Sequence, residues 1–401
     1  MVNNSWKTVT LSQIGTFQKG SGISRAESNS GTLPAVRYGE LYTVHNNYVR
    51  TYTSHVSREV ASKALRVHYG DILFACSGET KEDIAKCAAI IDDSEVYAGG
   101  DIIVLSPTTE VDPIFLGFIL NTQNVIQQRA QKAQGDAIVH ISTDSIKSIE
   151  ITLPEYEEQV RIAEALSDID TLIVNLEKLI AKKKAIKQGT MQELLTGKRR
   201  LPGFDGEWKL FPVSEIGKVI TGATPSRQIP GYWNGDFPWV SAQDFLGKYI
   251  SDTVEKITVE GMKGCRILPS GAVLITCIAS IGLNAITTVS CATNQQINAL
   301  ICNNGFNNEY VYYSICHSKQ EMMKIAGQTA VPILNKSQFE DFRLLMPQDI
   351  DEQRAIAAVL ADIDQEISQY EKQLMKYIGI KQGMMSELLT GNIRLIDKED
   401  A

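Results

Sequence analysis

The sequence lacks the features that mark membrane-bound or exported proteins. No stretch of its 401 residues approaches the ~20 uninterrupted apolar residues that a membrane span needs. The start of the chain, MVNNSWKTVT, has neither the basic beginning nor the apolar core of a signal peptide. We therefore expect a cytoplasmic protein without membrane contact, and the chain length favours two or three domains rather than one.

Cysteine is sparse and scattered. None of the seven cysteines forms a C-x-x-C pair, and no Cys/His cluster has the spacing of zinc ligands. Their neighbours are mostly apolar, as in ILFACSG and VLITCIAS, which is typical of small, reduced core residues. We expect no metal site and no disulfide framework.

Motifs for catalysis are also missing. The sequence has no G-x-x-x-x-G-K-[ST] loop to cradle nucleotide phosphates and no [DN]-P-P-[YF] run, and its five histidines form no nucleophile motif. Asp168/Asp170 and Asp362/Asp364 are two residues apart, so on a helix each pair points to different faces and is a poor acid/base pair. These absences predict a non-catalytic chain that binds no cofactor itself.

What the sequence does contain is a duplication. The segment EEQVRIAEALSDIDTLIVNLEKLIAKKKAIKQGTMQELLTGKRRL begins at Glu157, and DEQRAIAAVLADIDQEISQYEKQLMKYIGIKQGMMSELLTGNIRL begins at Asp351. They align without a gap at an offset of 194 residues, with more than half of the positions identical. A weaker echo precedes each copy, since Trp6-Lys7 and Ser24-Arg25 recur as Trp208-Lys209 and Ser226-Arg227. The chain is therefore a tandem repeat of a variable domain followed by a long helix.

Each repeated segment has the pattern of a coiled-coil helix. Apolar residues recur at alternating spacings of three and four, the spacing of a heptad seam; they are Leu166, Ile169, Ile173, Leu176, Ile180, Leu360, Ile363, Ile367, Tyr370 and Leu374. So narrow a stripe cannot be buried alone. We expect the two helices to pack as an antiparallel coiled coil with a pseudo-twofold axis; two separate helices, each docked on its own domain, are the alternative.

The remaining segments predict two globular domains. Short β-like runs such as GDILFACS and GAVLITCIA are bounded by Gly, Pro and Asn and alternate with short helical stretches. This pattern indicates an α+β fold with twisted, mostly antiparallel sheets. We divide the chain into a first domain at 1–155, a central helix at 156–204, a second domain at 205–347, and a C-terminal helix and tail at 348–401.

Several of these segments are familiar as a set. LPEYEEQVRIAEALSDID and MPQDIDEQRAIAAVLADID share one pattern, both helices end in K-Q-G-x-M-x-E-L-L-T-G, and GATPSRQIPGYWNGDFPWVSAQD looks like the opening of a target-recognition domain. Together they resemble the specificity subunit of type I restriction-modification systems, over essentially the whole chain.

The resemblance implies a function and a set of partners. Such a subunit binds an asymmetric bipartite site in double-stranded DNA, one half per domain, across a spacer set by the helices. It directs two modification subunits, which methylate adenine with S-adenosylmethionine, and restriction subunits, which cleave with ATP and Mg. Those cofactors and activities belong to the partner subunits.

The net charge of −8 counts against this interpretation, because phosphate contacts favour a basic face. Residues 157–201 are the only segment with a positive balance. Two alternatives therefore remain: a two-domain coiled-coil scaffold that organises a complex without reading DNA, and an enzyme with an unfamiliar site between the domains.

Candidate DNA contacts are side chains that can bind base edges or phosphates from loops. In the second domain they are Thr224, Ser226, Arg227, Ser241, Gln243, Asp244, Asn294, Gln295 and Gln296. In the first domain they are Lys19, Ser21, Ser24, Arg25, Arg37, Tyr38, Ser77, Lys81, Arg129 and Lys132. The run at 294–296 could equally be an ordinary polar turn, and Trp233 and Trp239 favour burial over base contact.

The most basic patch is Lys182-Lys183-Lys184 with Lys187. It could lie near the phosphates of the spacer. An exposed helix face or a subunit interface fits the same residues.

Overall fold

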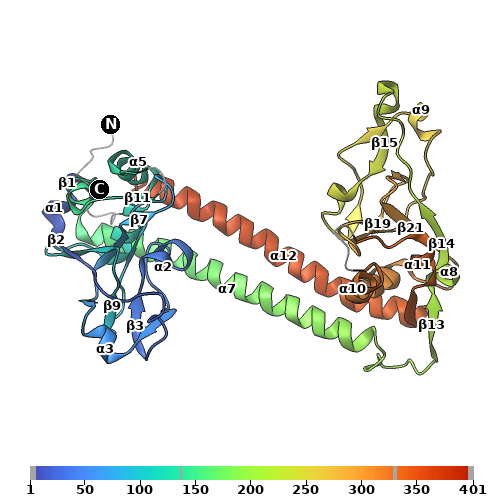
Figure 1. Ribbon diagram of the computed structural model, residues 1–401, viewed down its shortest axis with the longest axis horizontal. Helices are drawn as coiled ribbons and strands as arrows, with labels where there is room; N and C mark the ends of the chain where they lie inside the picture. Colours follow the sequence, from blue (N-terminus) through green and yellow to red (C-terminus); the bar gives the residue numbers. More distant parts are fainter. Residues whose placement is uncertain (1–5, 136–137, 328–331, 396–401) are drawn as a thin grey trace. The chain divides into compact units, whose positions relative to one another are not determined.

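The computed structural model describes residues 6–135, 138–327 and 332–395 (Figure 1). The chain divides into two compact units, the first from residues 1–177 and 373–401 and the second from residues 178–372. Each unit therefore combines one globular domain with a part of each long helix. None of the helices in the described ranges combines the length and apolar character needed to cross a membrane.

The two repeated segments form the long helices α7 (Tyr156–Leu194) and α12 (Ile350–Leu388), green and red in Figure 1. Each has 39 residues and lies within the segment expected from sequence, at 156–204 for the central helix and at 348–401 for the C-terminal helix and tail. Gly197 and Gly391 follow with φ of 69° and 72°, a left-handed conformation that glycine adopts without strain and that ends helices.

The first domain is built on two four-stranded sheets. One has the order β2 (Gly15–Lys19), β10 (Ile102–Pro107), β6 (Ile72–Ala75), β8 (Cys87–Ala89). The other has the order β4 (Ser54–Val56), β3 (Leu33–Val36), β9 (Val96–Ala98), β5 (Leu65–Val67). Two short pairs are β1 (Lys7–Thr10) with β12 (Glu150–Leu153) and β7 (Ser77–Gly78) with β11 (Val139–His140). The helices are α1 (Leu11–Ile14), α2 (Tyr38–Thr43), α3 (Arg58–Ala61), α4 (Pro113–Leu120), α5 (Gln123–Lys132) and α6 (Thr143–Lys147).

The second domain repeats this plan with different proportions. Its main sheet has the order β14 (Gly217–Thr221), β21 (Ile297–Cys302), β18 (Val273–Thr276), β19 (Asn284–Thr287), β16 (Tyr249–Ile250). A smaller sheet has the order β17 (Lys256–Ile257), β15 (Trp233–Val240), β20 (Ala292–Thr293), and β13 (Trp208–Pro212) pairs with β22 (Arg343–Pro347). The helices are α8 (Val213–Ile216), α9 (Val259–Met262), α10 (Asn308–Ile325), α11 (Lys336–Asp341) and the 3₁₀ turns η1 (Pro230–Tyr232) and η2 (Ala242–Asp244).

Most strand pairs are antiparallel; β3–β9, β15–β20 and β16–β19 are parallel. The expected α+β fold with mostly antiparallel sheets is confirmed. The apolar runs are explained by burial on both faces: Ile72 and Phe74 of β6 face one core cluster, while Leu73 and Ala75 face another.

Both long helices complete the core of each unit. In the first unit, Leu166 of α7 and Leu388 of α12 lie in the cluster that contains Ile72 and Phe74 of β6. In the second unit, Leu194 of α7 and Leu360 of α12 lie in the cluster that contains Val273 of β18. The domains are therefore not packed on a single helix each.

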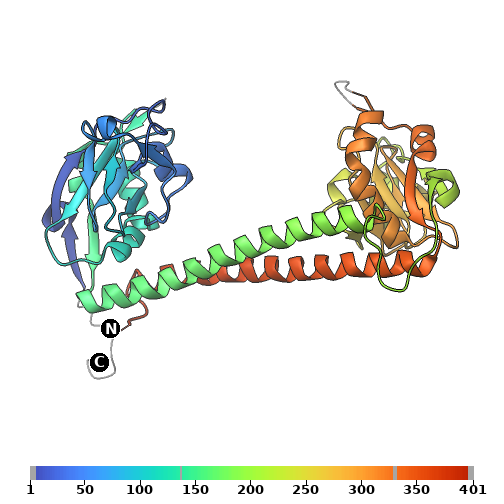
Figure 2. The same cartoon turned by 90° about the horizontal axis from the view of Figure 1, so that it is seen from below.

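Within each unit the two helix segments run antiparallel, as expected (Figure 2). In the first unit, Glu158 pairs with Arg394 and Asp170 with Lys381, so positions rise along α7 as they fall along α12. In the second unit, Lys187 pairs with Asp364. The seam residues Leu166, Leu176, Ile180, Leu360 and Ile367 are buried, and the other five are partly buried.

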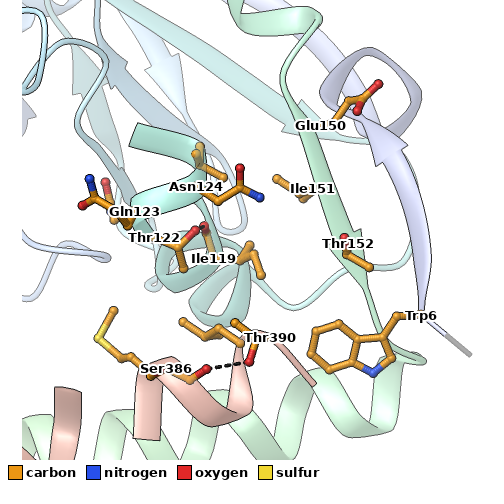
Figure 3. Close-up of a pocket in the computed structure, with 14 residues that line it drawn as sticks. Trp6, Ile119, Thr122, Gln123, Asn124, Glu150, Ile151, Thr152, Ser386 and Thr390 are labelled. Carbon is orange, nitrogen blue, oxygen red and sulfur yellow. Dashed lines mark hydrogen bonds between the residues drawn. The ribbon is translucent and has the colours of Figure 1, made fainter. Parts of the chain in front are cut away.

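The last turn of α12 faces the first domain across a cleft (Figure 3). Trp6, Ile119, Ser386 and Thr390 lie along it, and Thr390 Oγ1 donates a hydrogen bond of 2.6 Å to the carbonyl of Ser386. Gly391 lies directly against the Trp6 ring, where an added Cβ would come within 3.4 Å of the indole. The C-terminal segment is thus an integral part of the first unit.

Candidate nucleic-acid interface

In the second unit, four loops meet where the ends of the two sheets come together, and three of these loops carry candidate residues. The parallel strands β15 and β20 end side by side, and the amide of Asn294 donates to the carbonyl of Val240 at 3.0 Å. The amide of Cys277 donates to Gln296, and the amide of Ala223 donates to Thr293, at 2.9 and 2.8 Å. The loops that follow β14, β15, β18 and β20 therefore form one surface, which we call the second reading edge.

The first unit brings the corresponding loops together with a similar set of backbone hydrogen bonds. The amide of Gly99 donates to Val36 at 2.9 Å, which joins the ends of the parallel strands β3 and β9. The amide of Gly100 donates to Gly22, and the amide of Cys76 to Asp101, both at 2.9 Å. The ends of β2, β3, β6 and β9 thus form a first reading edge, built like the second.

One glycine in each edge is required by a close backbone approach. A Cβ on Gly20 would lie 2.1 Å from the carbonyl oxygen of Gly99, and a Cβ on Gly222 would lie 2.1 Å from the carbonyl oxygen of Asn294. No side chain fits at these distances, so these two positions of the repeat keep the loops in contact.

Most candidates in the second domain lie exposed on the second reading edge. Exposed side chains are those of Thr224, Ser226, Arg227, Gln243, Gln295 and Gln296, and Ser241 and Asn294 are half-buried. Thr224 donates a hydrogen bond to Gln295, which links two of the loops directly. The polar run at 294–296 is therefore part of the edge, and its Asn294 side chain also caps the backbone amide of Gln296.

On the first reading edge, Lys19, Ser21, Ser24, Arg25, Tyr38 and Lys81 are exposed. Two of the serines are engaged locally: Ser21 donates to the carbonyl of Lys63 at 2.8 Å, and Ser24 donates to Glu27 at 2.6 Å. Arg37 is partly held inside, where its Nε donates to Ser54 Oγ at 3.3 Å. Lys132, at the end of α5, is half-buried.

Arg129 is not a DNA contact, contrary to the expectation from sequence. Its side chain is 2% exposed, and Nη1 donates to the carbonyl of Ala85 at 2.5 Å. Burial lowers the pKa of its guanidinium. The neighbouring Cys87 is also fully buried, and burial raises the pKa of its thiol to about 11, which fits a reduced core residue.

Asp244 and Ser77 also need correction, because both are buried. Asp244 accepts hydrogen bonds from the amides of Ser241 and Val254 at 2.7 and 2.9 Å, so its carboxylate shapes the loop instead of facing a base. The Ser77 hydroxyl is bonded to His140 Nδ1 at 3.0 Å. His140 is exposed and is the more accessible group there; no local sequence pattern singles it out.

Trp239 is buried, as the sequence favoured, whereas Trp233 is only partly buried. Their rings pack edge to face with centroids 5.0 Å apart. The Arg227 guanidinium lies 3.8 Å from the centre of the Trp233 ring and is paired with Glu255. Glu255 is 28 residues away in the sequence and was not among the predicted residues, because nothing in its local sequence marks it as a partner of Arg227.

The basic run of α7 has partners on α12. Lys183 pairs with Glu366 at 2.6 Å, Lys184 with Glu371 at 2.7 Å, and Lys187 with Asp364 at 2.5 Å. These pairs within the chain differ from each of the alternatives inferred from sequence, which were spacer phosphates, an exposed helix face and a subunit interface. Three of the four lysines are neutralised within the chain.

No group of three or more His, Cys, Asp or Glu side chains in the described ranges is arranged to hold a metal ion. The pattern of both edges is instead one of exposed amides, hydroxyls and a few cations on loops. Such groups can form bidentate bonds to base edges and single bonds to phosphates.

Comparison with known proteins identifies the family. The family model "Type I restriction modification DNA specificity domain" matches residues 3–188 and 205–378, once for each half of the duplication. The chain belongs to this family of type I restriction-modification specificity subunits. The resemblance inferred from the sequence motifs is thereby confirmed.

Individual relatives carry the same description. Over 174 residues the chain is 35% identical to the MjaIX specificity subunit of a type I restriction enzyme from Methanocaldococcus jannaschii, a match that covers 42% of this chain and 40% of that one. A putative specificity subunit, MjaX, from the same organism is 25% identical over 86% of this chain and 83% of its own. The HindI specificity subunit of Haemophilus influenzae is 20% identical, covering 86% and 90%.

A solved structure shares the fold. The S subunit of a type I restriction-modification system from M. genitalium superposes with a TM-score of 0.65 at 16% sequence identity, covering 97% of both chains. This likeness in fold extends over both units and both long helices.

Proposed function

We propose that this chain reads an asymmetric bipartite site in double-stranded DNA, one half-site with each reading edge. The observation that carries the proposal is that in both units four loops converge at corresponding ends of the two sheets and present exposed amide, hydroxyl and basic side chains. Because the side chains on the two edges differ, the two half-sites should differ as well. The long helices then set the spacing between them.

The chemistry would belong to partner subunits. Two modification subunits would methylate adenine with S-adenosylmethionine, and restriction subunits would cleave with ATP and Mg. The chain itself would act in the cytoplasm as the non-catalytic component that binds no cofactor. With an acidic balance of −8 in this chain, the modification subunits would have to contribute much of the basic surface that DNA binding needs.

The test is methylome sequencing of cells that carry the chain with its modification subunits, against cells that lack it. Methyladenine at one asymmetric two-part motif is the expected result. A symmetric palindrome would contradict the two-reader proposal. A matched arm changes one helix by a single heptad, which should alter the spacer length and leave the recognised bases unchanged.

The scaffold alternative also has an observation in its favour. The net charge is acidic, and Lys183, Lys184 and Lys187 are paired with carboxylates of α12. If a modification subunit that is active with another specificity subunit produces no methylated motif with this chain, the scaffold function replaces DNA reading.

A further inference from the structure

Arg227 on the second reading edge is held in one orientation from two sides. Its Nη1 and Nη2 donate to the two carboxylate oxygens of Glu255 at 2.5 and 2.8 Å, a bidentate pair. Its guanidinium stacks on Trp233, with 3.8 Å from Cζ to the ring centre. One contact at the edge of the planar group and one on its face fix both its position and its plane.

The support beneath Arg227 is itself fixed. Trp233 Nε1 donates to the carbonyl of Ser226 at 3.2 Å, and Trp239 Nε1 donates to the carbonyl of Ala223 at 3.1 Å. Both indoles are therefore bonded to the backbone of the loop that carries Arg227. Trp239 is only 3% exposed, so the stack stands on the domain core.

The side chain nevertheless keeps unused donors that face solvent. A guanidinium has five N–H donors, and a bidentate pair through both Nη atoms leaves the Nε–H and one adjacent Nη–H as a second fork. The Arg227 side chain is 56% exposed despite its two contacts. A second planar acceptor pair can therefore bind without displacing Glu255.

The charge of Glu255 decides which acceptor is favoured. Hydrogen bonding to Arg227 lowers the pKa of the Glu255 carboxyl, so it is ionised at neutral pH. A phosphate that approached Arg227 would meet this second negative charge. The O6 and N7 atoms of guanine form a neutral acceptor pair in the major groove and match the geometry of the fork.

We propose that Arg227, buttressed by Glu255 and Trp233, reads one guanine in the half-site of the second unit. The inference deepens the proposed function and rests on it. Arg227 is the specificity-determining residue, and Glu255 is a positioning residue that acts through it. Binding needs little further ordering of the side chain because the free protein already holds it in place.

The first unit lacks this arrangement. Arg25 occupies the equivalent position of the repeat and is exposed, but its side chain has no ring stack or ion pair within residues 6–135, 138–327 and 332–395. On the reading edges, within the part of the chain that the structure describes, an arginine held by both a ring and a carboxylate is thus found only in the second unit. The guanine that it reads belongs to one half-site, which makes the test specific.

The experiment is methylome sequencing, with the modification subunits present, of the wild-type chain and of the variants Arg227→Lys and Glu255→Gln. Arg227→Lys keeps the charge and removes the fork, so one guanine position of one half-site should become degenerate while all other positions remain. Discrimination at that position should fall roughly tenfold to hundredfold on duplexes that differ only there. Glu255→Gln should relax the same position to a smaller extent.

Lys336→Gln is the matched control, because it breaks an exposed ion pair with Glu340 on α11 of the same domain and should leave the motif intact. A wild-type motif without a guanine in one half-site overturns the proposal. An unchanged motif in both Arg227→Lys and Glu255→Gln also overturns the proposal. Uniformly slower methylation at that motif would indicate a phosphate contact, and an unchanged rate would indicate a surface ion pair without a role in recognition. If Arg227→Lys abolishes methylation altogether, the motif of Glu255→Gln tests the proposal: a relaxed guanine position supports it, and an unchanged motif overturns it. Failure of the wild-type chain to give any motif contradicts the proposed function itself.

Discussion

The two units differ at their reading edges and agree where they are anchored to the long helices. In the first unit, Arg394 pairs with Glu158 and lies over the Trp6 ring. In the second, Arg200 pairs with Glu352 and lies over the Trp208 ring. The Glu and Arg positions are related by the same offset of 194 residues, with α7 and α12 exchanging roles.

A second anchor repeats in the same way. Asp170 of α7 pairs with Lys381 of α12 in the first unit, and Asp364 of α12 pairs with Lys187 of α7 in the second. Each aspartate also binds its domain, but through different groups: Arg50 forms an ion pair with Asp170, whereas the Tyr313 hydroxyl donates to Asp364. The helix-to-helix part of the anchor is kept, and the domain part has diverged.

The two repeats share the anchors to the long helices and differ in the side chains of the reading edges. Anchors are constrained because each serves two elements at once, a helix pair and a domain. Loops at the reading edges are bonded to one another and to their own domain, so the backbone contacts through Gly20 and Gly222 persist while the side chains change. Divergence at the edges and conservation at the anchors is the pattern expected of two readers on one scaffold.

The largest effect is expected at the anchor of the first unit. Glu158 is 3% exposed and accepts from Arg394, from Trp6 Nε1 and from the amide of Leu395. Glu158→Ala should lower the free energy of unfolding of that unit by about 3 kcal/mol, because it removes the buried carboxylate that pairs with the partly buried Arg394 guanidinium. Urea denaturation followed by tryptophan fluorescence measures this, since Trp6 is the only tryptophan of the first unit.

The matched variant in the second unit is Glu352→Ala. The Arg200 side chain is 28% exposed against 17% for Arg394, so water compensates more of its charge. The expected loss is about 2 kcal/mol. A larger loss for Glu352→Ala than for Glu158→Ala would mean that the two anchors are not ranked by burial.

The Glu158 anchor should also respond to acid. Burial alone would raise the pKa of the Glu158 carboxyl, but the hydrogen bonds and charge of Arg394 outweigh it and hold the pKa below its usual value of 4.5. A lowered pKa in the folded state means that the stabilisation is complete above about pH 4.5 and is lost as the pH falls further. The difference in free energy of unfolding between wild type and Glu158→Gln should therefore shrink between pH 5 and pH 3. Urea denaturation of both proteins at each pH measures it. A difference that stays constant over this range would contradict the ionised pair.

A smaller effect is expected at the aspartate anchors. The Asp170 side chain is 12% exposed and binds two cations, whereas Asp364 is 27% exposed and binds one cation and a hydroxyl. Asp170→Asn should cost about 1–2 kcal/mol and Asp364→Asn about 1 kcal/mol. Because one partner of Asp170 is a second cation, the cost of its substitution should fall more steeply with added salt. Equal salt dependence in both variants would show that the two anchors are electrostatically alike.

Much of this organisation follows from the sequence, for physical reasons. The gapless repeat and the heptad spacing predict two long helices and their pairing, and Gly and polar residues after apolar runs predict the loops of the edges. The prediction that Arg129 contacts DNA was wrong because its side chain points inward and donates to the carbonyl of Ala85. The two residues are 44 positions apart, and local periodicity does not encode such a contact. Asp244 caps a backbone turn whose geometry is equally invisible in the sequence.

The lysine run could have been interpreted correctly from symmetry. If an antiparallel pair brings Asp170 to Lys381, the repeat offset requires Lys187 to meet Asp364, as the structure shows. Only the register of the helix pair was missing, and the register depends on how both domains pack. Neighbouring lysines then find carboxylates of the opposite helix.

The smallest expected effect is at this run and separates the helix pair from the reading edges. Lys184 is paired with Glu371 at 2.7 Å, so Lys184→Gln should leave the salt dependence of DNA binding unchanged. Lys19 is exposed on the first reading edge, and if it contacts one phosphate, Lys19→Gln should reduce the slope of log K against log salt by about 0.9. Fluorescence anisotropy of the complex with its modification subunits, titrated on cognate duplex at several salt concentrations, measures both slopes. If Lys184→Gln reduced the slope as much as Lys19→Gln does, DNA phosphates would contact the helices as well as the reading edges.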